Sequence, residues 1–293
     1  EYLEEGSLLQ FADSTETYDH EHSVVFKTFK VDHGYEEAFF EYNRVDALVM
    51  EHLTSSPFVI NMYGFCGMSV FQEFAGQELS KVVDKLHPLE KLNVANKVAR
   101  GITDVHNAGF VHNDLNFANI AFTNRKESPV LNDFNVGVIV LKHNETGKDC
   151  DFTHHFPNPQ WRSPEEQMNI EVESPHLTKA IDIYALGNIL FRFATGRIPW
   201  KIDKQPRLSP EQKEIVSLLK RNGTMPPLIF PNGKFERFQD DPATTAMLSV
   251  MEECYTLEPK KRPTAQQVVN KLQRALHNLT HAPKVAAQQG QNL

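Results

Sequence analysis

The chain has 293 residues, of which 40% are hydrophobic and 23% are charged, an ordinary composition for a soluble globular protein. This length suits one large domain or two lobes that share a cleft. The formal net charge of −8 argues against nucleic acid or an anionic membrane surface as the main partner.

The cysteines and the longest uncharged stretch bear on location. Cys66, Cys150 and Cys254 are an odd number without metal-ligand spacing, which favours reduced thiols and a cytoplasmic protein. The uncharged stretch from Leu53 to Gln72 is too polar to span a bilayer, so we expect no membrane contact from this segment. Because the chain begins with Glu1 rather than methionine, we expect it to be a fragment. It could then be the intracellular part of a longer chain. The oligomeric state is not predicted.

The first predicted strand lies near the amino terminus. Leu3 to Phe11 contains a single glycine, Gly6. The run SVVFKTFK, from Ser23 to Lys30, alternates in the manner of a β-strand and carries Val25 and Lys27. A lone lysine on such a strand is usually solvated, so Lys27 points to chemistry only in combination with later motifs.

A helix is predicted from Tyr35 to Leu53, because apolar residues recur there at helical spacing. Asp46 shares the face of the apolar residues that follow it, so its carboxylate is expected to face inward. Glu41 and Glu51 are each five residues away, about 140 degrees round the helix. The periodicity therefore places Asp46, rather than Glu41 or Glu51, on the inward face of the helix.

Two short strands follow this helix, from Phe58 to Met62 and from Met68 to Glu73, joined by a turn. The segment QEFAGQ, from Gln72 to Gln77, connects the second of these strands to the helical part of the chain. A long amphipathic helix is predicted from Glu90 to His106, and Gly109 lies just past its end, as expected of a helix stop.

The segment VHNDLNFANI, from Val111 to Ile120, sets Asp114 and Asn119 five positions apart in a short polar loop. The aspartate can accept the proton of an attacking hydroxyl, while the asparagine on the same turn can reach a magnesium ion that bridges nucleotide phosphates. A second aspartate, Asp133, lies among apolar residues in VLNDFNVGV.

Three further segments complete the chain. WRSPEE spans Trp161 to Glu166, and a helix that is apolar nearly all round is predicted from Leu177 to Thr195, with Asp182 near its start. Arg262 lies in KKRPTAQQVV, close to the end of the predicted fold. Residues 280–293 form a polar tail that is predicted to be disordered.

Taken in order, these segments resemble the landmarks of the eukaryotic protein kinase catalytic domain, in a divergent form. The catalytic-loop pattern H-R-D-L-x-x-x-N is matched by His112, Asp114, Leu115 and Asn119. VLNDFNVGV is similar to the D-F-G segment, WRSPEE to the A-P-E segment, and VVFK to the lysine motif V-A-I-K. A chance match to one motif is common, whereas six matches in the family's order are not.

The resemblance implies an α+β, bilobal fold. Its N-lobe, at about residues 1–73, would be a small antiparallel sheet with one helix, the family's C-helix. A hinge at about residues 73–77 would lead into a larger, mainly α-helical C-lobe at about residues 78–279, followed by the tail.

The resemblance also implies ATP and magnesium as cofactors and a protein substrate. Asp114 would orient the acceptor hydroxyl, Lys27 would hold the α and β phosphates, and Asp46 would pair with Lys27. Catalytic roles fall on Lys27, Asp114 and Asn119; cofactor binding on Gly6, Val25, Lys27, Asp46, Glu73, Ala75, Ala121 and Asp133; metal binding on Asn119 and Asp133. Asp182 is expected to hold the catalytic-loop backbone, and Arg262 to pair with Glu165.

Several positions depart from the family pattern. Asn113 replaces the usual arginine, Asn116 the lysine common in serine/threonine kinases, and Asn135 the glycine of D-F-G, while only Gly6 remains of three glycines. These departures leave a pseudokinase, a binding or scaffolding module, as the alternative to an active kinase. We favour serine/threonine over tyrosine acceptors on the family's prevalence alone. A small-molecule phosphotransferase of related fold would not need WRSPEE or the pair of Glu165 with Arg262.

Overall fold

The computed structural model describes residues 24–28, 37–123, 128–154, 158–167, 176–201, 207–228 and 240–281. Gly6 and most of the predicted tail lie outside these residues. The described strands are β1 (Val24–Thr28), β2 (Met62–Cys66), β3 (Ser69–Glu73), β4 (Gln77–Glu78), β5 (Phe110–Val111), β6 (Ile120–Thr123), β7 (Ser128–Leu131) and β8 (Val138–Ile139). The described α-helices are α1 (Glu37–His52), α2 (Leu79–Val82), α3 (Pro88–Asn107), α4 (Ala180–Thr195), α5 (Pro210–Arg221), α6 (Pro242–Cys254) and α7 (Ala265–His281), and the 3-10 turns are at Val83–Lys85, Glu165–Gln167 and Pro259–Lys261.

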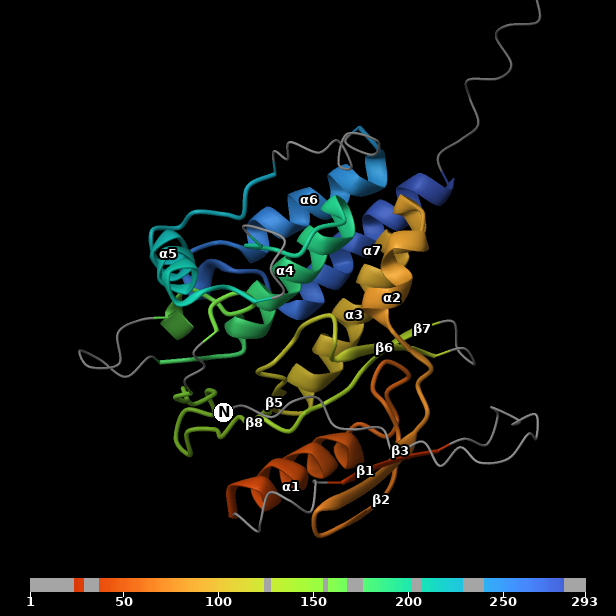
Figure 1. Ribbon diagram of the computed structural model, residues 1–293, viewed down its shortest axis with the longest axis vertical. Helices are drawn as coiled ribbons and strands as arrows, with labels where there is room; N and C mark the ends of the chain where they lie inside the picture. Colours follow the sequence, from red (N-terminus) through yellow and green to blue (C-terminus); the bar gives the residue numbers. More distant parts are fainter. Residues whose placement is uncertain are drawn as a thin grey trace, which may run out of the picture.

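The small lobe is an antiparallel sheet in the order β1-β3-β2, with α1 packed against β2 and β3. Figure 1 shows these elements in red and orange below the larger, helical part of the chain. The alternating pattern of β1 gives each of its faces a different environment. Phe26 is on the exposed face, where its ring lies 4.6 Å from that of Phe71, and Lys27 follows on the other face.

One predicted strand is wrong. The segment from Phe58 to Ile60 joins neither described partner strand of the small lobe, because its backbone bonds to Leu131 of the other lobe. Ile60 donates its N–H to the carbonyl of Leu131 at 3.0 Å, and Leu131 donates to the carbonyl of Phe58 at 2.8 Å. The strand that pairs with β3 is therefore β2, which starts at Met62. The stretch from Phe58 to Asn61 ties the two lobes together instead.

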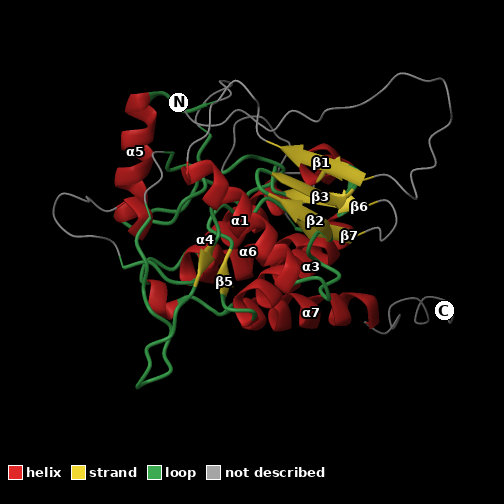
Figure 2. Cartoon of the chain, turned by 90° about the horizontal axis from the view of Figure 1, so that it is seen from below, coloured by secondary structure: helices red, strands yellow, loops and turns green. Residues whose placement is uncertain are grey.

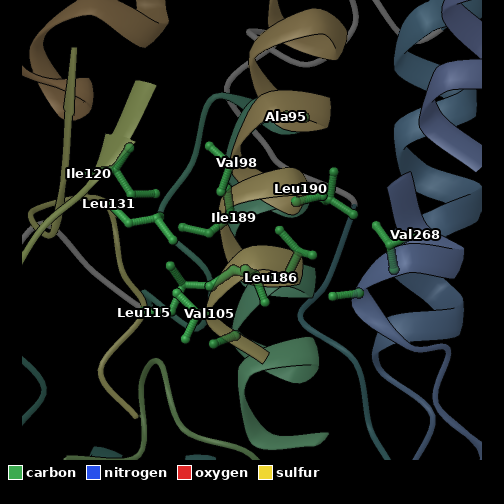
Figure 3. Close-up of a cluster of buried hydrophobic side chains, with 14 of the residues drawn as sticks. Ala95, Val98, Val105, Leu115, Ile120, Leu131, Leu186, Ile189, Leu190 and Val268 are labelled. Carbon is green, nitrogen blue, oxygen red and sulfur yellow. The ribbon is translucent and has the colours of Figure 1, made fainter. Parts of the chain in front are cut away.

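The large lobe is built around α3 and α4, with α6 and α7 packed on them. Figure 2 shows these helices gathered below the strands of the small lobe. Val98 of α3, Leu190 of α4 and Val268 of α7 belong to one buried hydrophobic cluster, each 1% exposed or less (Figure 3). At Gly187 of α4 a Cβ atom would lie 3.0 Å from the Cβ of Cys254 on α6. This close approach explains a glycine inside a buried helix.

Several predicted helix boundaries move, among them the start of α3, which is Pro88 rather than Glu90. The helix α4 begins at Ala180 rather than Leu177, because Leu177 exchanges backbone hydrogen bonds with Phe152, at 2.9 and 3.0 Å. At the other end of the lobe, α7 continues through His281, where the Thr280 hydroxyl donates to the carbonyl of Leu276 at 2.8 Å. The first two residues of the predicted tail are therefore helical.

The fold class predicted from the resemblance is confirmed: a mixed α+β chain with a small antiparallel sheet and a larger helical part. The sheet β4-β6-β7 lies between the two parts, and two short loops, between β5 and β6 and between β7 and β8, meet beside it. Gly109, with φ of +85°, ends α3 and turns the chain into β5. Within the described residues, none of the helices combines the length and apolar composition that crossing a bilayer requires.

Candidate active site

The loop between β5 and β6 carries Asp114 and Asn119, and Asp182 of α4 holds its backbone. The Asp182 carboxylate accepts hydrogen bonds from the N–H groups of His112, at 2.8 Å, and Asn113, at 3.0 Å. These bonds stabilise Asn113 in a left-handed conformation, with φ of +62°, which costs a non-glycine residue energy. The expected role of Asp182 is therefore what the structure shows.

Within this loop, Asn119 orients Asp114. The Asn119 amide donates to the Asp114 carboxylate at 2.9 Å and to the Asp114 backbone carbonyl at 2.8 Å. The side chain of Asp114 is 31% exposed, so one edge of its carboxylate faces solvent. Burial raises the pKa of Asp114 above its usual range, and the nearby Arg162 guanidinium opposes that rise.

Lys27 joins the two lobes electrostatically. Its ammonium lies 3.1 Å from the carboxylate of Asp46 on α1 and 2.8 Å from that of Asp133 in the loop after β7. Burial by itself lowers the pKa of Lys27, but the two carboxylates outweigh it and hold the pKa above its usual value. The lysine is therefore charged at neutral pH.

Asp46 is the inward acid of α1, as its position on the helix predicted. It is 1% exposed, and it also accepts a hydrogen bond at 2.7 Å from the backbone N–H of Phe134. The contact with Lys27 is direct, so α1 lies close enough to the sheet for the shorter aspartate side chain. Glu41 instead pairs with Arg44, at 2.6 Å on the outer surface, and Glu51 is exposed.

Asp133 is held in a strained position beside Asn119. Its φ is +64°, in the left-handed region that favours glycine. The preceding Asn132 donates its N–H to the Asn119 carbonyl at 3.0 Å, which brings the two loops together. The Asn113 amide donates to the Val136 carbonyl at 2.8 Å and links them a second time.

The donor set of these loops suits magnesium. Asp133 contributes carboxylate oxygens, and the side-chain amide nitrogen of Asn119 is engaged with Asp114, which leaves its oxygen as the atom for a metal. Magnesium prefers oxygen ligands, and in nucleotide sites it commonly uses one or two carboxylates together with phosphate and water oxygens. The two residues therefore fit the expected ion.

The remaining cofactor residues of the described chain lie on two sheets and in the connection between them. Val25 in β1 pairs with Gln72 of β3, whereas Ala121 in β6 pairs with Glu78 of β4. Glu73 donates its backbone N–H to the Asn61 carbonyl at 2.8 Å. Ala75 follows it in the connection from β3 to β4 and is buried.

The pair of Glu165 and Arg262 is present and buried. Two guanidinium nitrogens of Arg262 donate to the two carboxylate oxygens of Glu165 at 2.6 and 2.7 Å. Arg262 also donates to the carbonyl of Thr256 at 2.8 Å and to that of Ala180 at 2.9 Å. This pair joins the WRSPEE segment to the start of α4.

Sequence reasoning missed two site residues. Arg162 lies 2.5 Å from the Asp114 carboxylate and donates to the Asn113 carbonyl. His106, at the end of α3, contacts Asp182 at 2.9 Å. The position of Arg162 directly before the SPE triplet was only a weak local signal. Asp114, the residue that Arg162 contacts, is 48 residues away in the chain.

Comparisons with known proteins agree with this geometry. The model of the protein kinase domain matches residues 12–272. A "Probable serine/threonine-protein kinase" of Dictyostelium discoideum is 26% identical over 197 residues, which are 66% of this chain and 10% of the relative. The fatty acyl-CoA synthetase and RNA processing-associated kinase 1 of Saccharomyces cerevisiae is 27% identical over 231 residues, 75% of this chain and 25% of the relative.

A mitogen-activated protein kinase of Caenorhabditis elegans is 26% identical over 200 residues, 64% of this chain and 49% of the relative. The chain thus spans less than half the length of each of these three relatives. The family model covers most of the chain. The chain belongs to the protein kinase domain family.

Proposed function

We propose that this chain transfers the γ-phosphoryl group of ATP to serine or threonine hydroxyls of a protein substrate. The observation that carries the proposal is the convergence of Lys27, Asp46 and Asp133, from three distant segments, beside the loop of Asp114 and Asn119. Phosphoryl transfer depends mainly on positioning and charge stabilisation, and this arrangement provides both.

Asp114 accepts the proton of the attacking hydroxyl, and Asn119 keeps its carboxylate turned toward the cleft. Lys27 holds the α and β phosphates, and Asp46 keeps its ammonium in place. Asp133 and Asn119 would hold magnesium, which would supply positive charge against the phosphates. Val25, Ala121 and the backbone from Glu73 to Ala75 would hold the adenine.

The serine/threonine preference is supported by the name of the Dictyostelium discoideum relative, which is described as a probable serine/threonine-protein kinase. We place the cleft between an N-lobe of about residues 1–73 and a C-lobe of about residues 78–279, joined by residues 73–77. We also propose a cytoplasmic location. Neither the described contacts nor the comparisons favour the pseudokinase that the sequence departures left open, because the charged residues of the site remain in contact.

The test is transfer of radioactive phosphate from ATP to a peptide library that contains serine, threonine and tyrosine acceptors, followed by phosphoamino-acid analysis. We expect wild type to label serine and threonine and Asp114→Asn to lose this activity. Nucleotide at a hundredfold over its dissociation constant should still stabilise the Asp114→Asn fold by about 2.7 kcal/mol in the presence of magnesium.

Asp84→Asn is the matched control, because Asp84 is exposed and contacts Arg192 rather than the site. It should behave as wild type in both assays. Nucleotide binding without transfer by wild type to any acceptor would establish the pseudokinase instead.

A further inference from the structure

Lys220 of α5 is a fully buried lysine that none of the roles above uses. Its side chain ends at the segment from Pro159 to Arg162, directly before the SPE triplet. The ammonium donates to the carbonyls of Pro159 at 2.7 Å, Gln160 at 3.3 Å and Arg162 at 2.6 Å. Three carbonyls for three protons satisfy the ammonium completely.

A lysine at this place is costly for the fold. Lys220 is 0% exposed, and burying an ammonium is unfavourable unless each of its protons finds an acceptor. Burial accordingly lowers the pKa of Lys220 well below its usual value. The rings of Tyr184 and Trp200 offset part of this cost, with centroids 5.0 and 5.2 Å from the ammonium. An apolar side chain would fill the space more cheaply but would leave the carbonyls unpaired.

The carbonyl that Lys220 leaves unbound in this segment, that of Trp161, is also held. Asn188 of α4 donates its amide to it at 2.9 Å, and the Tyr255 hydroxyl donates to the oxygen of Asn188 at 2.8 Å. Four consecutive carbonyls, from Pro159 to Arg162, are therefore bound by two buried side chains of the helical core. The backbone of this segment is held at every residue.

Arg162, at the end of this segment, contacts the catalytic-loop residue Asp114. Lys220 binds its carbonyl, while its guanidinium lies 2.5 Å from the Asp114 carboxylate and 3.5 Å from that of Glu166. A flexible arginine is placed accurately only if its backbone is fixed. The contacts thus form a continuous path from α5 through Lys220 and Arg162 to Asp114.

We propose that Lys220 is a positioning residue for phosphoryl transfer: it holds the segment from Pro159 to Arg162 so that the Arg162 guanidinium stays against the Asp114 carboxylate. This inference rests on the proposed function. Lys220 touches none of the reacting groups, and ATP is held elsewhere, by Lys27 and Asp133. Loss of Lys220 should therefore act on kcat and leave the KM for ATP unchanged.

The test measures kcat and both KM values for Lys220→Met, Arg162→Gln and the double variant. We expect Lys220→Met to lower kcat between about tenfold and a hundredfold, the range expected when a reacting group is misplaced by about 1 Å. In the Arg162→Gln background the same substitution should lower kcat little further, because the two residues act through one contact. Lys220→Gln, which keeps some donors, should lie between wild type and Lys220→Met, and it replaces Lys220→Met in the cycle if that variant does not fold.

Lys91→Met is the matched control. Lys91 is a second buried lysine of the large lobe, 7% exposed, and its charged neighbours are Asp84 and Arg192 rather than the segment from Pro159 to Arg162. It should lower stability without changing kcat. A folded Lys220 variant with unchanged kcat would overturn the inference, and so would losses of kcat that multiply in the double variant. Absence of transfer by wild type would instead overturn the proposed function itself.

Discussion

At the scale of single residues, the charge of Lys27 is balanced by two carboxylates with different tasks. Asp133 is 32% exposed in its side chain and is the one expected to meet metal and phosphate. Asp46 is buried, and it holds both the ammonium and the backbone of Phe134. Asp46 therefore ties the lysine of β1 to the loop after β7.

This arrangement predicts the effect of Asp46→Asn. The amide keeps an oxygen for the Phe134 N–H but loses the charge that fixes Lys27. We expect kcat/KM for ATP to fall about tenfold, equivalent to about 1.4 kcal/mol. Glu41→Gln, on the outer face of the same helix, should leave kcat/KM unchanged because Glu41 is exposed and pairs with Arg44, away from Lys27. Steady-state kinetics with varied ATP concentration measures kcat/KM for both variants. Equal losses of kcat/KM in the two variants would contradict the role of Asp46.

At the scale of elements, hydrogen bonds and an ion pair hold both the beginning and the middle of the WRSPEE segment against the helical core. Lys220 and Asn188 bind carbonyls before the SPE triplet, and Arg262 binds Glu165, the last residue of that triplet. The Arg262 side chain is 0% exposed, so its pair with Glu165 is shielded from solvent. Exposed ion pairs contribute little to stability, whereas breaking a buried pair leaves an uncompensated charge.

We therefore expect Arg262→Met to lower the free energy of unfolding by about 3 to 5 kcal/mol. Lys271→Met removes an equally short pair, with Glu253 at 2.5 Å, but both of those side chains are more than 40% exposed. That control should cost less than about 1 kcal/mol. Urea unfolding of both variants measures the difference. Adding Glu165→Gln to Arg262→Met should recover part of the loss, and a cost as small as that of Lys271→Met would show that Glu165 finds another partner.

At the scale of the whole molecule, Asp182 joins α4, α3 and the loop of Asp114. Burial acts to raise the pKa of Asp182, but the hydrogen bond and charge of His106, the charge of His112 and the backbone bonds from the loop hold the pKa below its usual value. A carboxyl group whose pKa is lower in the folded than in the unfolded state stabilises the fold fully above the unfolded pKa. That stabilisation is lost as the pH falls through the folded pKa.

The lowered pKa of Asp182 predicts how Asp182→Asn changes the dependence of stability on pH in acid. Wild type should lose stability steeply below about pH 4, near the unfolded pKa of an aspartate, and the variant should lose less over the same range. At pH 7 the variant should be the less stable of the two. Urea unfolding at a series of pH values measures both curves. Asp240→Asn, at an exposed position, should follow wild type, and parallel acid slopes for wild type and Asp182→Asn would refute the assignment.

The sequence by itself determined the features that depend on local spacing. Helical periodicity placed Asp46 on the inner face of α1, because residues three or four apart share a face whatever the helix packs against. The loop of Asp114 and Asn119 was equally local, since five positions suffice to bring the amide to the carboxylate. The order of the motifs then indicated the family and the two-lobed fold.

Only the tertiary structure decided the contacts between distant segments. Arg162 meets Asp114 across 48 residues, and Lys220 meets Arg162 across 58, and neither separation leaves a periodic signal in the sequence. The segment at Phe58 shows the same limit: its composition favours a strand, but its backbone partner is Leu131 of the other lobe. Local propensity selects the kind of structure that a segment can adopt, whereas packing selects its partner, because each partner is set by how the helices and strands come together.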